Sequence, residues 1–213
     1  GLAGPKKRLG GAKGLRRHLH GPLGDLDIVL IGENVTSSGV IKADNANGNG
    51  GDIELHANDT TLLTENSQTT ARSETNGTGG TVKVLGDKVG LFDQTTVDVS
   101  GANGGGQALI GGDYQGNNRY IRNALRTYVG SKVNLYADAL YNGDGGELIN
   151  WADEYTWFYG SAFSRGGTIS GNGGLVEISG AGLAFEGFVD TSAAYGETGT
   201  LLFDPTDITV ESG

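Results

Sequence analysis

Arginine and tyrosine side chains crowd one interval of this 213-residue chain, between Gly105 and Gly145. Guanidinium groups donate several hydrogen bonds in one plane, and tyrosine rings stack on flat or apolar faces. Such a set suits a sugar or a protein ligand, so we name it a candidate recognition site. Its members are Asp113, Tyr114, Arg119, Tyr120, Arg122, Arg126 and Tyr128.

Two alternatives apply to the same residues. Arginine and acidic side chains in a lateral groove also serve polysaccharide lyases and hydrolases, so a carbohydrate-active enzyme is the alternative function. No convergent acid–base set is visible in the sequence, and we expect no catalytic residues. The structural alternative, which we favour over ligand binding, is that the segment packs on the flank of the fold and pairs its arginines with local carboxylates.

Aromatic residues form a second cluster between Trp151 and Phe163. If they alternate along strands, some must face outward and form an adhesive patch, for which Trp151, Trp157 and Tyr159 are the candidates. The structural alternative is an aromatic column stacked along the flank of the fold.

A calcium ion is a further candidate ligand, because Asn49–Asp52 and Asp144–Glu147 place acidic side chains beside paired glycines. Calcium-binding nonapeptide repeats, however, recur every nine residues. Here the pairs recur far less often, and turn formation explains the same residues. We therefore expect no metal and no cofactor. His56 is expected to be a surface residue, and His18 and His20 to lie in a basic tail.

Charge divides the chain in two. Residues 1–24 contain six basic and no acidic side chains, whereas the rest contains nine basic and 25 acidic ones. The acidic body argues against nucleic acid as a partner. The chain has no cysteine and no apolar run long enough for a membrane helix. We expect residues 1–24 to be a Gly-rich leader, disordered or poorly packed, and residues 25–213 to form one repeat domain, a fragment of a longer protein.

Paired glycines recur through this domain, and 40 of the 213 residues are glycine. The pairs begin at Gly50, Gly79, Gly105, Gly145 and Gly173. Asn and Asp accompany them, and these residue types reach the positive φ of sharp turns at least cost. The intervals are similar in length except the one from Gly105 to Gly145. This longer interval holds an insertion of roughly a dozen residues, which is the candidate recognition segment.

A short segment of period-two alternation follows each pair, which predicts a strand with one buried face. Alignment of these segments predicts two inward columns: Ile53/Leu55, Val82/Val84, Ala108/Ile110, Leu148/Asn150 and Val176/Ile178. Asn150 is the one polar member. A register shifted by one residue, with Ile149 and Trp151 inward, is the alternative.

A second apolar run precedes each glycine-rich turn, for example Gly39–Ala43, Thr96–Ser100 and Lys132–Ala137. Two or three short strands per repeat of about 27 residues match the coil of a β-solenoid, which buries its apolar face only by stacking. The sequence therefore predicts an all-β fold, a right-handed parallel β-helix of roughly six to seven degenerate coils.

These repeats, taken in order, resemble the passenger repeats of filamentous-haemagglutinin-like proteins. The matching stretches are Gly79–Lys88, Val97–Gly106, Ile110–Asn117, Thr127–Ala139, Asn142–Gly160, Gly173–Gly180 and Thr198–Val210. Proteins of that family are adhesins exported by two-partner secretion in Gram-negative bacteria and cyanobacteria.

The resemblance implies a secreted or cell-surface protein with a structural and adhesive role. Its partners would be a glycan or protein receptor on a host or neighbouring cell, and an outer-membrane transporter. The family's export domain carries Asn-Pro-Asn motifs, but no Asn precedes Pro5, Pro22 or Pro205. We therefore expect the transporter to engage a region outside this fragment, which also shows no signal peptide.

Overall fold

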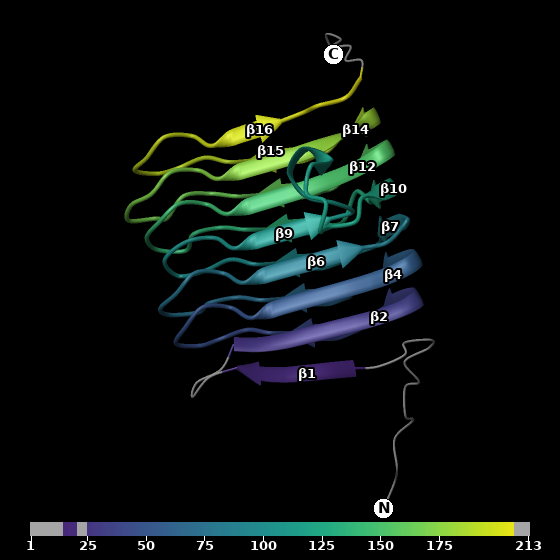
Figure 1. Ribbon diagram of the computed structural model, residues 1–213. Helices are drawn as coiled ribbons and strands as arrows, with labels where there is room; N and C mark the ends of the chain where they lie inside the picture. Colours follow the sequence, from purple (N-terminus) through teal and green to yellow (C-terminus); the bar gives the residue numbers. More distant parts are fainter. Residues whose placement is uncertain (1–14, 21–24, 207–213) are drawn as a thin grey trace, which may run out of the picture.

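The protein is a β-solenoid whose coils stack from β2 at one end to β16 at the other (Figure 1). The computed structural model describes residues 15–20 and 25–206. Two sheets of ten and six strands run along the stack. Within these residues the only helical element is a single 3₁₀ turn, η1 (Tyr114–Gly116). No helix among them is long and apolar enough to cross a membrane.

Each coil has three walls. The first and second walls belong to the ten-stranded sheet, and a bend in the strand separates them, as the register shifts at Gly32/Asn34 and Ala152/Tyr155 show. The strands of this sheet are β1 (Leu15–His20), β2 (Asp25–Ser37), β4 (Asp52–Leu63), β6 (Thr81–Leu85), β7 (Lys88–Leu91), β9 (Gln107–Ile110), β10 (Ala124–Val129), β12 (Glu147–Phe158), β14 (Leu175–Phe185) and β16 (Thr200–Leu202).

The third wall is the six-stranded sheet, one short strand per coil. Its strands are β3 (Val40–Lys42), β5 (Gln68–Thr70), β8 (Thr96–Asp98), β11 (Asn134–Tyr136), β13 (Ser161–Phe163) and β15 (Phe188–Asp190). Six such strands give about six turns, and the predicted parallel solenoid is confirmed. The second apolar run of each repeat forms this wall, as expected.

Parallel pairing places equivalent residues of successive coils in columns. The column through Ile53 continues with Val82, Ala108, Leu148 and Val176. Its members are at most 2% exposed, and the neighbouring column runs from Leu55 to Ile178. Both predicted inward columns are therefore confirmed residue by residue.

Hydroxyl groups line the interior where the strands bend. Thr61 donates to the carbonyl of Leu85 at 2.7 Å, and Thr156 donates to that of Ser179 at 2.7 Å. Carbonyls at a bend lose their regular ladder partners, and a buried carbonyl without a partner costs free energy. Threonine suits this position because it keeps a strand-forming, branched side chain and adds a donor.

Glycine pairs form the corners between the third wall and the next coil. Gly105 donates to the carbonyl of Asp144, and Gly106 donates to that of Val99. A Cβ added to Gly105 would meet the backbone carbonyl of Ala137 and the amide of Gly146 in the adjacent coil. The coils therefore stack this closely only because the corner carries no side chain.

The N-terminal end of the stack differs from the rest, because β1 pairs antiparallel with β2. This strand lies within the predicted leader, residues 1–24. The remainder of that segment, residues 1–14 and 21–24, falls outside the described residues, as do residues 207–213. The predicted boundary at residue 25 stays a prediction.

Replacing Gly105 by alanine should destabilise the fold by about 1–3 kcal/mol, the usual cost of overpacking. The matched control is Gly39→Ala, because a Cβ there would meet nothing within 4 Å. The measurement is the free energy of unfolding from urea titration of each variant. Equal stability of the two variants would show that the corner does not limit coil spacing.

Candidate functional site

The candidate recognition segment is a loop inserted at the bend between β9 and β10. Ile110 and Arg126 flank it, and their partners in the preceding coil, Val84 and Lys88, are joined by a short turn. The extra length confirms the insertion that the sequence predicted. We call residues 111–123 the insertion loop; it lies on the outside of the first wall, across β12 and toward β14 (Figure 1).

Local hydrogen bonds fix the loop. Asp113 accepts from the backbone N–H of Tyr114 at 2.7 Å and from the Asn118 side chain at 2.6 Å. The side-chain amide of Asn123 donates to the carbonyl of Gly116 at 3.0 Å and to Asp153 at 2.9 Å. Asp113 thus acts as a cap for the 3₁₀ turn. Its predicted role as a ligand-binding group stays a prediction.

The loop covers outward-facing side chains of the first wall. Leu109, Ile149 and Glu177 form one outward column, yet they are 1%, 1% and 0% exposed. Trp151 is half-buried beside them, with its ring beneath Gly112 and Gly116 and its Nε1 donating to Asp153 at 2.9 Å. The predicted packing of the segment against the flank is therefore what the structure shows.

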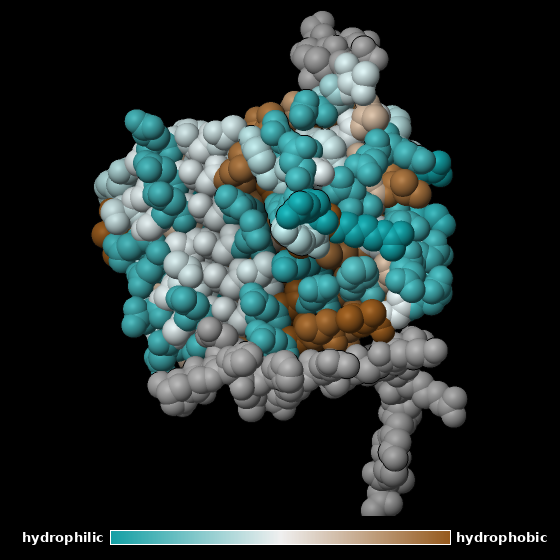
Figure 2. Space-filling view, viewed as in Figure 1, coloured by the Kyte–Doolittle hydropathy of each residue, from teal (hydrophilic) through white to brown (hydrophobic). Residues whose placement is uncertain are grey.

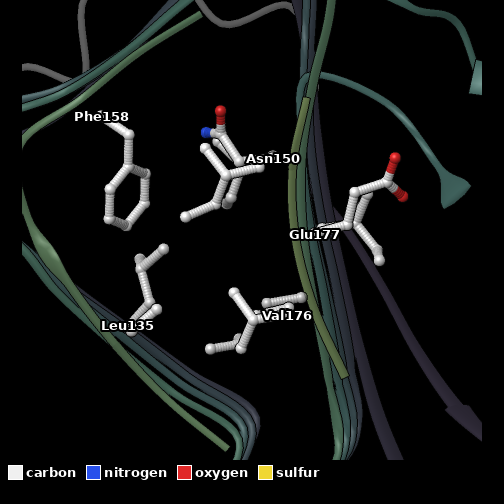
Figure 3. A pocket seen from close by; sticks show the side chains of 11 residues that line it. Leu135, Asn150, Phe158, Val176 and Glu177 are labelled. Carbon is white, nitrogen blue, oxygen red and sulfur yellow. The ribbon is translucent and has the colours of Figure 1, made fainter. Parts of the chain in front are cut away.

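Glu177 is a buried carboxylate at the outer side of β14. In Figure 3 it points away from the interior, whereas Leu135, Phe158 and Val176 point inward from the three walls. Its Oε2 accepts the backbone N–H of Gln115 at 3.0 Å, and its Oε1 has no partner among the described residues. No sequence pattern singles out this residue, because the alternation marks its position only as outward.

Desolvation by burial raises the pKa of Glu177 above its usual value of 4.5. The backbone hydrogen bond from Gln115 and the nearby Ser179 hydroxyl lower the pKa, and the charges of Asp113 and Asp204 add to the rise. An ionised carboxylate in this position has lost hydration that one backbone bond only partly replaces. The loop is therefore closed over a carboxyl group whose ionisation costs more free energy than it does in water.

The arginines of the predicted site divide between the flank and the loop tip. Arg122 pairs with Asp87, and Arg126 pairs with Glu154 at 2.9 Å, which are the local ion pairs we expected. Arg119 instead lies over the ring of Tyr120, with its guanidinium carbon 4.8 Å from the ring centroid.

Three side chains form the exposed tip of the loop: Tyr114, Arg119 and Tyr120. Tyr120 is 80% exposed and Tyr114 is 45% exposed. Figure 2 shows mostly hydrophilic side chains on this face around the loop. Arg122 and Arg126 are exposed as well, but on the flank and in ion pairs, so the loop tip holds the three exposed predicted residues that lie outside those pairs.

Of the aromatic candidates, Trp151 lies on the first wall beneath the insertion loop, and Trp157 and Tyr159 lie along the second wall. Trp157 packs against Tyr155 with ring centroids 4.3 Å apart, and Tyr159 contacts Tyr128 at 5.8 Å. Tyr128 in turn stacks on Phe92 at 4.9 Å. All are partly buried. Phe92, Tyr128 and Tyr159 come from three successive coils and form the aromatic column along the flank that was the structural alternative, whereas Tyr155 and Trp157 pair within one strand.

Asn150 faces the interior, as the alignment predicted, and is 2% exposed. Its Oδ1 accepts from Thr127 at 2.9 Å, and the Thr127 hydroxyl lies 3.0 Å from that of Thr156. The register alternative, with Ile149 inward, is wrong. Ile149 is buried by the insertion loop on the opposite side of the strand.

The turn residues of the two candidate calcium motifs take part in bonds between coils. Asn49 accepts the N–H of Thr78 at 3.0 Å, and Asp144 accepts that of Asn172 at 2.7 Å. In the part of the chain that the structure describes, no three acidic or histidine side chains are grouped to hold a metal ion. The absence of calcium stays a prediction.

The protein is thus a parallel β-solenoid whose first wall is covered in part by an insertion loop. No protein-family model matches the sequence, and no curated protein matches it. Among solved structures, the chain is similar to the crystal structure of the HMW1 secretion domain from Haemophilus influenzae, with a TM-score of 0.59 and 20% identity. The match covers 82% of this chain and 61% of that one. At this identity the likeness establishes a common fold.

Replacing Glu177 by glutamine should stabilise the protein at neutral pH. Because the pKa is raised in the folded state, the wild type loses stability as pH rises from about 4.5 through the folded-state pKa. The variant lacks this loss, so its advantage should appear above pH 4.5 and vanish at more acidic pH. The measurement is the free energy of unfolding across this range.

Glu54→Gln is the matched control, because Glu54 occupies the same outward column but is partly exposed. This substitution removes the carboxylate that lies 3.2 Å from His56 Nδ1, but it should not reproduce the stabilisation above pH 4.5 that is expected for Glu177→Gln. If the free energy of unfolding of Glu177→Gln varies with pH in parallel with that of the wild type, the pKa of Glu177 is not raised by folding.

Proposed function

We propose that this chain is a non-catalytic segment of a secreted or cell-surface filamentous-haemagglutinin-like protein that attaches to a glycan or protein receptor on a host or neighbouring cell. The solenoid would serve as a rigid rod and the insertion loop as the attachment point. The order of the repeats and the fold shared with a secretion domain support this proposal. They also support export through an outer-membrane transporter of the two-partner type.

The observation that carries the proposal is the construction of the loop. Its base is fixed by Asp113, Asn123 and the contact with Glu177, whereas its tip presents Arg119 and Tyr120 to solvent. Functional residues are concentrated on loops positioned by a rigid scaffold, and Tyr and Arg are enriched among residues that dominate binding energy. An anchored loop also loses little conformational entropy on binding.

The enzyme alternative finds less support. It requires the arginines to converge with carboxylates in a groove, but Arg122 and Arg126 each pair with a single carboxylate at the surface. Glu177, whose raised pKa would suit a general acid, is fully enclosed beneath the loop. A substrate would reach it only after the loop had opened. We therefore favour binding over catalysis.

The double variant Arg119→Ala/Tyr120→Ala should weaken attachment of the purified chain to epithelial cells by about tenfold, since truncating a central Tyr or Arg commonly costs at least about 1.4 kcal/mol. Flow cytometry of cells incubated with the labelled chain measures this. Tyr195→Ala, which removes another tyrosine that is 74% exposed, is the control. Equal attachment of both variants would exclude the loop tip as the attachment point.

A further inference from the structure

The outer face of the third wall carries an open, polar hollow of about 500 Å³, on a different sheet from the strands that support the insertion loop. Its lining consists of amides, one hydroxyl and one ammonium group. These residues are Asn66, Gln68, Gln94, Thr96, Lys132 and Asn134.

The lining residues belong to three successive coils. Gln68, Thr96 and Asn134 are direct partners in the parallel ladder, so their side chains form one column. Asn66, Gln94 and Lys132 each precede one of these by two positions and lie at the turns that lead into the strands. The hollow is therefore bounded by two parallel rows whose polar groups repeat about every 4.8 Å along the stack.

These polar groups are free of side-chain partners. Within residues 25–206 the only bond from these side chains is a long one, 3.4 Å, from the Asn134 amide to the carbonyl of Lys132. Elsewhere on the solenoid, polar neighbours in adjacent coils pair directly, including Arg72 and Asp98 at the other end of the third-wall strands, 3.3 Å apart. Gln107 bonds to Glu147 at 2.7 Å, and Lys88 bonds to Asp59 at 3.0 Å. The residues that line the hollow thus present unused donors and acceptors in a regular array.

We propose that this hollow binds an extended, neutral polysaccharide along the axis of the solenoid. Amides and hydroxyls both donate and accept hydrogen bonds, which matches the hydroxyl groups of a sugar. A rise of about 4.8 Å per coil is close to the length of one sugar unit, so successive coils would contact successive units in the same way. One polysaccharide chain would therefore be bound by several coils at once.

Charge favours a neutral over an acidic glycan. The lining contains no carboxylate and a single cation, Lys132. Glu65 and Asp93, which precede Asn66 and Gln94 in the sequence, are exposed, and the whole chain has a net charge of −10. A polyanionic chain would meet this negative field over its whole length. On the same face, the stacked rings of Tyr136 and Phe163, 5.0 Å apart, lie next to the column and give it an apolar border.

This site adds a specific ligand class to the attachment role proposed above, and in that sense it rests on the proposed function. Affinity electrophoresis tests it with the whole chain in gels that contain hydroxyethyl cellulose, galactomannan or polygalacturonate. At least one of the two neutral polymers should retard the wild type more strongly than polygalacturonate. The double variant Gln68→Ala/Asn134→Ala should lower the association constant about tenfold, as expected for the loss of several hydrogen bonds.

Asn58→Ala is the matched control, because Asn58 is an exposed amide on the strand β4, away from the third wall. It should bind like the wild type, and circular dichroism verifies that every variant is folded. The loop variant Arg119→Ala/Tyr120→Ala should also retain full retardation, which separates this site from the loop tip. No retardation by either neutral polymer, stronger retardation by polygalacturonate, or an unchanged Gln68→Ala/Asn134→Ala variant would overturn the proposal.

Discussion

Backbone hydrogen bonding between successive coils is the constraint on which the rest of this structure depends. Each coil donates to and accepts from its neighbours in parallel register, so every position is stacked on its equivalents at a fixed distance. The type of residue at each position is therefore restricted by its stacked neighbours in adjacent coils as much as by its neighbours in sequence. Branched aliphatic residues occupy the interior columns, threonines occupy the bends, and glycines occupy corners such as Gly105, where any side chain would meet the next backbone.

The same constraint explains where an insertion can be accepted. At the bend between the first and second walls the ladder already shifts register, so the insertion loop can leave between β9 and β10 while both flanking segments stay paired. The loop then returns across the first wall and converts an outward column into a second, smaller core around Leu109 and Ile149. This arrangement gives the loop a rigid base, and it encloses the carboxylate of Glu177 as a consequence.

The predictions from sequence succeeded where the signal was local and repeated. Paired glycines and period-two alternation identified the coils, the two inward columns and the place of the insertion. They did not predict that the first and second strand segments of a coil form one bent strand such as β4. A bend this short does not visibly interrupt the period-two alternation of the sequence. Most of the candidate binding residues proved to be ion-paired or stacked on the flank, and Tyr114, Arg119 and Tyr120 at the loop tip are the exposed ones outside the ion pairs.

The sequence by itself determined the solenoid, its period and which face of each strand is buried, because these follow from turn chemistry and alternation over short stretches of chain. Only the tertiary structure decided the environment of outward-facing residues. Glu54 and Glu177 occupy the same column and look alike in the sequence, yet only Glu177 is fully enclosed, because a loop from a distant part of the chain closes over it. The polar hollow of the third wall has the same origin. Gln68, Thr96 and Asn134 are far apart in the sequence, and stacking alone makes them neighbours.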